Sequence, residues 1–251
     1  FARLIGSTPL QIELTLVTMS NHVSKTTPAA HMKSFYKSFS EIVEQKFDGL
    51  LITGAPIEHL SFREVVYWDE LKKIFDWTQT NVYSTFAVCW GAMAMLNYFH
   101  NIPKYSLKAK AFGCFEHLVE APENRYLRGF MDTVIVPVSR WSELKRSDIE
   151  KHNLSILISS DIVGPCLIED ETYKALYMLN HLEYDTNTLN TEFMRDSLVN
   201  QETDLPINYF PHNDSRRQPI NRWRSHGHLL YGNWINEIYQ TTPYDLNQIR
   251  A

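Results

Sequence analysis

The chain has 251 residues, with 24 lysines and arginines against 29 aspartates and glutamates and a formal net charge of -5. This balance excludes a generally basic nucleic-acid binder, and the 44% hydrophobic fraction excludes a disordered chain. The longest apolar run, residues 86–96, has eleven residues, whereas a membrane-spanning helix needs roughly 18. We therefore expect a soluble globular protein with no membrane segment and no nucleic-acid partner.

The cysteines are sparse and give no structural framework. Cys89, Cys114 and Cys166 are too few and too far apart for a disulfide scaffold or a zinc ribbon, and they favour the reducing cytoplasm. His226-Gly227-His228 has no third ligand at a recognisable spacing, so no metal site is expected. The sequence begins with Phe1 rather than Met, which leaves a preceding targeting segment open.

From the N-terminus, alternating polar and apolar residues predict a strand over residues 11–17. Thr27-Pro28 is typical of a helix start, because Thr can cap a helix and Pro fits its first position. This helix is expected to end near Asp48-Gly49, and residues 50–53 then predict a short buried strand. Apolar residues at helical spacing predict a further helix over residues 67–78.

The rest of the chain continues the alternation of strand and helix. Residues 82–88 predict a strand, which Cys89-Trp90-Gly91 separates from a helix over residues 92–98. Further strands are predicted at residues 133–138, 155–158, 165–168 and 176–179, and helices at about 186–198 and 229–239. This order implies a mostly parallel sheet covered on both faces. Because no linker divides the chain, residues 1–251 are expected to form one α/β domain.

The strand–helix junction at Cys89 is the strongest local signal for chemistry. A nucleophile at such a sharp turn lies at the carboxyl edge of the sheet, where open α/β folds bind ligands. The helix N-terminus favours a thiolate, the Trp90 amide could stabilise an oxyanion, and Gly91 permits close backbone approach. The local sequence fits equally well a cysteine that is only a small buried apolar residue.

His181 and Glu183 follow the last predicted strand and supply the second signal. An imidazole at this position can accept the thiol proton, and a carboxylate two residues later can orient the ring. The pattern is common, and alone it describes a solvated loop. Combined with Cys89 at another strand end, the order Cys, His, Glu favours an α/β thiol enzyme.

A series of short motifs runs in order through almost the whole chain. These motifs are Phe47-Asp48-Gly49-Leu50, Thr53-Gly54-Ala55-Pro56, Cys89-Trp90-Gly91-Ala92, Leu127-Arg128-Gly129-Phe130, Glu183-Tyr184-Asp185, Asn208-Tyr209-Phe210-Pro211, Trp223-Arg224-Ser225-His226 and Thr242-Pro243-Tyr244-Asp245-Leu246. In these motifs, taken together, the sequence resembles the homoserine O-acyltransferases of methionine biosynthesis, whose members transfer succinyl or acetyl groups. The resemblance implies a class I glutamine amidotransferase-like fold, which is a three-layer α/β sandwich, and a homodimer.

The resemblance also implies roles for particular residues. Cys89 would carry the acyl group, His181 would accept the proton and Glu183 would be its partner. The oxyanion would be held by the Trp90 amide and the backbone of Gly54 and Ala55.

Three further residues, Lys110, Ser139 and Arg195, fall at the family's substrate-contact positions. Arginine can bind an amino acid's carboxylate through two hydrogen bonds, and lysine adds a point charge. The alternatives are a solvated loop charge at Lys110 and a surface ion pair at Arg195.

Glu58 falls where the family's acyl-donor choice is set, since relatives with Gly there favour succinyl-CoA and those with Glu favour acetyl-CoA. A carboxylate at this position removes space and repels the succinyl carboxylate. Acetyl-CoA is therefore the implied co-substrate, with no permanently bound cofactor.

The chain departs from the family pattern beside the expected acceptor site. Val138 stands where the family usually has His, Asn180 where it has Gly and Leu182 where it has Pro. Some relatives acetylate L-serine, so the acceptor is a small hydroxy amino acid, L-homoserine or L-serine. A homoserine O-succinyltransferase, a glutaminase-type thiol hydrolase and an inactive regulatory relative remain alternatives.

Overall fold

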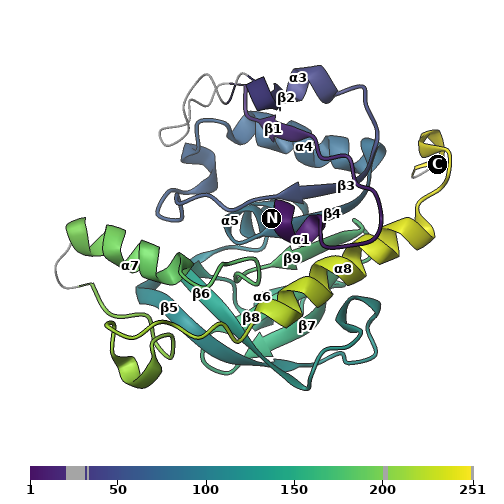
Figure 1. Cartoon of the computed structure of the whole chain (residues 1–251). Helices are drawn as coiled ribbons and strands as arrows, with labels where there is room; N and C mark the ends of the chain where they lie inside the picture. Colours follow the sequence, from purple (N-terminus) through teal and green to yellow (C-terminus); the bar gives the residue numbers. More distant parts are fainter. Residues whose placement is uncertain (21–31, 33, 200–202, 250–251) are drawn as a thin grey trace.

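The computed structural model describes residues 1–20, 32, 34–199 and 203–249 (Figure 1). Its helices are α1 (Ala2–Ile5), α3 (Phe39–Ile42), α4 (Trp68–Asn81), α5 (Trp90–His100), α6 (Arg146–Ile149), α7 (Thr188–Val199) and α8 (Arg224–Thr241). Its strands are β1 (Leu16–Thr18), β2 (Tyr36–Ser38), β3 (Phe47–Ile52), β4 (Val82–Val88), β5 (Tyr105–Val119), β6 (Thr133–Glu143), β7 (Ser155–Ser160), β8 (Gly164–Asp170) and β9 (Ala175–Met178). None of the described helices is long and apolar enough to cross a membrane.

Seven strands form the main sheet in the order β3-β4-β9-β8-β7-β5-β6, and β1 pairs with β2 separately. The strands β3, β4 and β9 run parallel, while the pairs from β9 to β6 are antiparallel. The turns that join β7 to β8 and β8 to β9 are too short for a crossover, so these neighbours must be antiparallel. The α/β class is confirmed, and the sheet is mixed, with its parallel part at β3-β4-β9.

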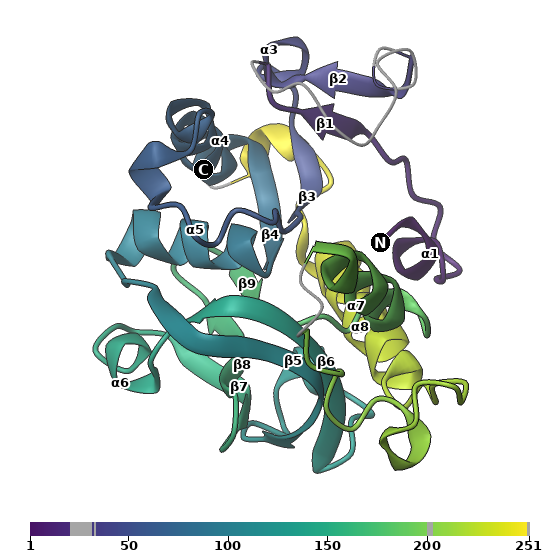
Figure 2. The same ribbon diagram turned by 90° about the vertical axis from the view of Figure 1, so that its left-hand side faces the viewer.

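Both faces of the parallel part are covered, which gives the three layers visible in Figure 2. Successive β4 side chains point to opposite faces. Phe86 packs with Trp234 of α8, whereas Ala87 belongs to the cluster that contains Phe75 of α4 and Met93 of α5. The carboxyl ends of β4 and β9 are thereby held side by side between two helical layers.

Two predictions for the elements were wrong or incomplete. Strand β5 was not predicted, because its register shifts between Ser106 and Ala111 and the shift breaks the alternation that marks a strand. The long helix expected from Thr27-Pro28 is reduced to α3, preceded by β2, and its expected start lies outside the described residues. That residues 1–251 form one domain stays a prediction.

Candidate active site

Cys89 lies at the turn between β4 and α5 in a strained backbone conformation. Its φ is 52° and its ψ is -121°, a left-handed φ that costs a non-glycine residue on the order of 1–3 kcal/mol. The Cys89 N–H donates a hydrogen bond to the Met178 carbonyl at 2.6 Å, which ties this turn to the end of β9. Such strain is typical of a nucleophile at a strand–helix turn.

Glycines leave room around this turn. A Cβ on Gly91 would lie 2.8 Å from the Thr53 carbonyl oxygen, and a Cβ on Gly54 would lie 3.7 Å from the Cys89 sulfur. The segment after β3 therefore packs directly on the Cys89 turn. The Trp90 amide belongs to the first turn of α5, where N–H groups lack intrahelical acceptors. Gly54 and Trp90 thus flank Cys89, with Ala55 next in the same segment.

His181 and Glu183 meet as expected from their spacing. The His181 Nδ1 and Glu183 Oε1 atoms are 2.6 Å apart, and both side chains are buried. The His181 N–H donates to the Pro137 carbonyl at 2.9 Å. The Tyr184 ring stacks on the imidazole, with centroids 4.1 Å apart and planes 18° apart. The ring that faces Cys89 is thus fixed on several sides.

The electrostatics favour a charged imidazole. Burial lowers the pKa of His181, but the Glu183 carboxylate and the charge and hydrogen bonding of Cys89 outweigh it, so the net pKa lies well above the ordinary value. The physical consequence is that the imidazolium form of His181 is stabilised beside the Cys89 sulfur. All three cysteines are buried, and burial raises the pKa of both Cys114 and Cys166 to about 12.

The three expected substrate-contact residues converge on two acids of α7. The Lys110 Nζ lies 2.8 Å from Asp196 and 3.8 Å from Glu192. Ser139 donates a hydrogen bond to Glu192, and Arg195 pairs with Asp196 at 2.8 Å with most of its side chain exposed. Sequence analysis missed Glu192 and Asp196, although their spacing of four residues places them on one face of the predicted helix.

Glu58 lies half-buried near the same site. Burial raises the pKa of its carboxyl group, against the opposing charges of His181, Lys110 and Lys104. Lys104 also donates a hydrogen bond to the Glu58 carbonyl oxygen. The carboxyl group that the resemblance links to donor choice is therefore close enough to the imidazole to sense its charge.

The three departures from the family pattern lie in the interior. Val138 packs in a small apolar cluster with Phe115. Leu182 is 2% exposed, and its carbonyl oxygen lies against α8. Asn180 is fully buried and contacts Arg140 and His117. None of these substitutions displaces His181 from Glu183.

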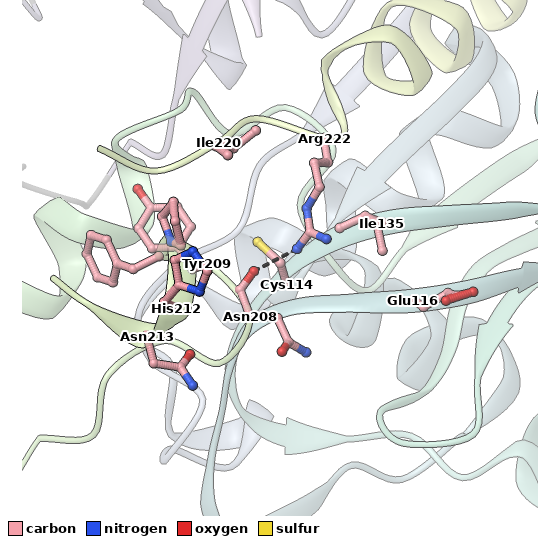
Figure 3. A pocket seen from close by; sticks show the side chains of 11 residues that line it. Cys114, Glu116, Ile135, Asn208, Tyr209, His212, Asn213, Ile220 and Arg222 are labelled. Carbon is pink, nitrogen blue, oxygen red and sulfur yellow. Dashed lines mark hydrogen bonds between the residues drawn. The ribbon is translucent and has the colours of Figure 1, made fainter. Parts of the chain in front are cut away.

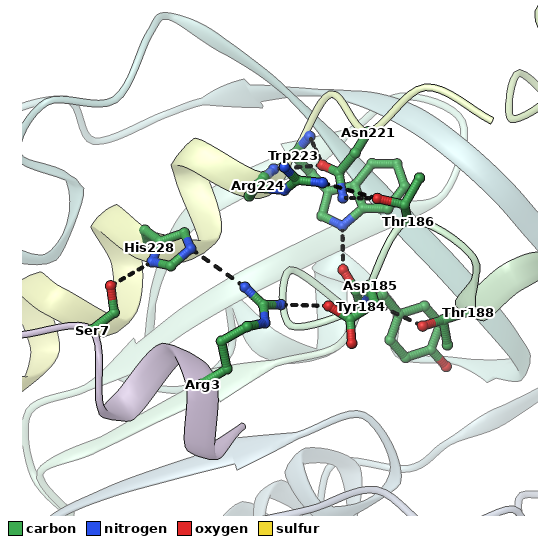
Figure 4. A network of polar contacts seen from close by, with 10 residues as sticks. All are labelled: Arg3, Ser7, Tyr184, Asp185, Thr186, Thr188, Asn221, Trp223, Arg224 and His228. Carbon is green, nitrogen blue, oxygen red and sulfur yellow. Dashed lines mark hydrogen bonds and ion pairs between the residues drawn. The ribbon is translucent and has the colours of Figure 1, made fainter. Parts of the chain in front are cut away.

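His228 and Arg224, near the start of α8, have local hydrogen-bond partners. His228 lies 2.8 Å from Ser7, and Arg224 donates to Thr186 (Figure 4).

A cavity of about 570 Å³ lies between β5, β6 and residues 208–222. Arg222, which lines this cavity, donates a hydrogen bond to the Asn208 carbonyl oxygen (Figure 3). This cavity contains none of the expected catalytic side chains. The described residues hold no group of metal-ligating side chains.

Comparison with known proteins decides the family. The family model for homoserine O-succinyltransferase matches residues 1–244. The chain belongs to the homoserine O-succinyltransferase family. It is 58% identical to a homoserine O-acetyltransferase of Roseobacter denitrificans over 250 residues, covering 99% of this chain and 82% of that protein. It is 60% identical to a homoserine O-acetyltransferase of Dinoroseobacter shibae over 250 residues, with the same coverage.

Solved structures confirm the expected fold. A glutamine amidotransferase of Thermotoga maritima matches with a TM-score of 0.56 at 13% identity, covering 75% of this chain and 77% of that one. A putative GMP synthase subunit of Thermoplasma acidophilum matches with a TM-score of 0.53 at 14% identity, covering 92% and 96%. These structures confirm the prediction of a class I glutamine amidotransferase-like fold, and the family match confirms the prediction of an acyltransferase.

Proposed function

We propose that the chain is an O-acetyltransferase that moves an acetyl group from acetyl-CoA, through a thioester on Cys89, to the side-chain hydroxyl of L-homoserine in methionine biosynthesis. The observation that carries this proposal is the strained Cys89 turn facing the His181–Glu183 pair. The relatives that share 58% and 60% of the sequence support the choice of acetyl and homoserine. A cytoplasmic homodimer without a permanently bound cofactor is part of the proposal.

The first half-reaction transfers the acyl group to the enzyme. The Cys89 thiolate attacks the thioester carbonyl, and the resulting oxyanion accepts hydrogen bonds from the backbone around Trp90 and Gly54. When the tetrahedral intermediate collapses, the bond to the coenzyme A sulfur breaks. The His181 imidazolium gives its proton to that leaving thiolate, which leaves a neutral imidazole beside the acetylated cysteine.

The second half-reaction reverses these roles. Neutral His181 removes the proton from the acceptor hydroxyl as the oxygen attacks the Cys89 thioester. The ester forms, the Cys89 thiolate is released and His181 is again an imidazolium. Glu183 stabilises this charged form of the ring through the 2.6 Å contact at Nδ1.

The acidic and basic groups beside the pair suit a zwitterionic acceptor. Lys110 and Arg195 offer positive charge to the amino acid's carboxylate. The Glu192 carboxylate receives hydrogen bonds from Ser139 and Tyr184, and we assign it to the acceptor's ammonium group. In this arrangement the charged groups of the bound substrate replace the ion pairs that these side chains make with one another when no substrate is bound.

The test is acylation of the intact protein by acetyl-CoA alone. Wild type is expected to gain one acetyl group on Cys89, measured by mass spectrometry, and Cys89→Ala is expected to gain none and to lose transfer. Free-thiol release with L-homoserine, L-serine or L-glutamine then identifies the acceptor. Preference for L-serine would replace the acceptor assignment, and ammonia release from L-glutamine would indicate a hydrolase. Absence of acylation in a folded wild type would indicate an inactive relative.

A further inference from the structure

Arg140 of β6 is a buried guanidinium with an unusual set of partners. Its side chain is 2% exposed. Its Nε donates to the Asn180 side-chain oxygen at 3.2 Å, one terminal nitrogen donates to the Ser142 carbonyl at 2.7 Å, and the other donates to the Val163 carbonyl. Each of the three guanidinium nitrogens thus has one acceptor, and every one of these acceptors is neutral.

No carboxylate among the described residues lies within ion-pair distance of Arg140. His117, which accepts from Asn180 at 3.0 Å, adds no charge, because burial lowers its pKa to about 4. An unpaired buried charge destabilises a fold, and such a charge is usually paired or hydrogen-bonded to an anion. The negative groups that act on this guanidinium, Cys89, Glu143 and Glu58, therefore do so from beyond ion-pair distance.

The backbone connects Arg140 to the nucleophile turn. Asn180, which holds the guanidinium, directly precedes His181. Two residues earlier, the Met178 carbonyl accepts the Cys89 N–H at 2.6 Å. In addition, the Ser142 hydroxyl contacts the Met93 sulfur in the first turns of α5. Arg140 thus contacts the segment that carries His181, and its acceptor Ser142 contacts the helix that follows Cys89.

We propose that Arg140 is a positioning residue for acyl transfer, whose buried positive charge stabilises the Cys89 thiolate while its contact with Asn180 fixes the segment that carries His181. The inference rests on the proposed role of Cys89 as nucleophile. Asn180, which replaces the family's usual Gly, is then the residue that orients this charge in the present chain. Burial lowers the pKa of Arg140, and the charges of Cys89, Glu143, Cys166 and Glu58 oppose that effect.

Other charged groups also face the thiol. His181 and Glu183 form the pair beside it, and Tyr184 stacks on that imidazole. Glu58, with Lys104 and Lys110 near it, approaches from the segment after β3 and from β5. Substitutions at Arg140 remove none of these groups, and Arg140→Lys keeps the positive charge, so a difference in thiol titration between Arg140→Met and Arg140→Lys reports on that charge.

The experiment measures the rate at which iodoacetamide alkylates Cys89 as a function of pH, by mass spectrometry, and needs neither acyl donor nor acceptor. Removing an opposite charge raises a thiol pKa by about one unit or more, so Arg140→Met should raise the midpoint and lower alkylation roughly tenfold below it. Arg140→Lys, which keeps the charge, should recover most of the rate. Arg146→Met is the matched control, because that guanidinium pairs with Glu120 and Glu150.

Asn180→Asp supplies a second test that does not remove the arginine. The new carboxylate would pair with Arg140 and cancel its charge, so the midpoint should again rise. This variant decides the matter if Arg140→Met does not fold. An unchanged midpoint in a folded Arg140→Met or Asn180→Asp protein would overturn the inference. Because alkylation requires no substrate, the result is independent of whether acetyl transfer to homoserine is the activity.

Discussion

At Cys89 the left-handed backbone is tolerated because neighbouring groups hold it in place. The 2.6 Å hydrogen bond to Met178 fixes the N–H, and the absence of side chains at Gly54 and Gly91 lets the segment after β3 close over the turn. Strain on the order of 1–3 kcal/mol at one residue is small against the packing of two helical layers. The sulfur is thereby held beside His181.

A substitution at Glu58 tests how this single residue affects the choice between acetyl-CoA and succinyl-CoA as acyl donor. Glu58→Gly should raise kcat/KM for succinyl-CoA relative to acetyl-CoA by roughly tenfold, equivalent to about 1.4 kcal/mol, because it removes both bulk and negative charge. Glu58→Gln keeps the size and removes only the charge, and we expect a smaller rise. Steady-state kinetics with the two donors measure the ratio. An unchanged ratio in both variants would exclude Glu58 from donor selection.

Individual residues could be predicted where they belong to a recognisable sequence motif. They could not be predicted where only folding brings distant residues together. Cys89, His181 and Glu183 are identifiable because residue type and spacing both point to a thiol site. Glu192 reaches Ser139 and Tyr184 only because α7 lies beside β6 and the segment that follows β9. No local sequence pattern predicts a contact between segments so far apart in the chain.

At the scale of elements, α8 positions the segment that carries His181. The Trp223 indole N–H donates to the Tyr184 carbonyl at 2.7 Å (Figure 4). One turn later, Gly227 lies so close to this segment that a Cβ there would be 2.6 Å from the Leu182 carbonyl oxygen. The helix therefore supports both residues that flank Glu183 in sequence.

Two glycine substitutions in α8 separate this role from helix propensity. Gly227→Ala should displace the Leu182 carbonyl, lower kcat by tenfold or more and lower the free energy of unfolding. In Gly232→Ala the new Cβ meets no atom within 4 Å, so we expect normal kcat and a gain of about 0.5–1 kcal/mol. Urea unfolding and steady-state rates measure both. Equal behaviour of the two variants would contradict the positioning role of α8.

The regular elements were predictable where burial leaves a clear pattern in the sequence. Strand β4 and helix α4 match their predicted positions closely, because β4 is buried on both faces and α4 buries one face. Strand β5 has a register shift and carries exposed lysine near one end, so it shows no clean alternation. In the antiparallel half of the sheet, the direction of each strand depends on how the chain turns back after the preceding strand. The composition of the strands does not predict this direction.

For the whole molecule, two buried histidines make stability depend on pH in opposite ways. His181 has a raised pKa in the folded protein, so its contribution is fully present below about pH 6.5 and is lost as the pH rises through the folded value. His117 has a folded pKa of about 4, so between pH 4 and 6.5 the unfolded chain binds the extra proton. Over that range the free energy of unfolding must fall as the pH falls.

His117→Asn should flatten this acid dependence. A difference between about 4 and the ordinary value of 6.5 corresponds to roughly 3 kcal/mol lost on acidification, and the variant has no imidazole to protonate. We expect it to be less stable at neutral pH, because the hydrogen bond from Asn180 is lost, yet to lose less between pH 6.5 and 4. Urea unfolding at several pH values measures the slope, with the exposed His59→Asn as control. If wild type and His117→Asn lose stability in parallel, the buried neutral His117 is not the source of acid sensitivity.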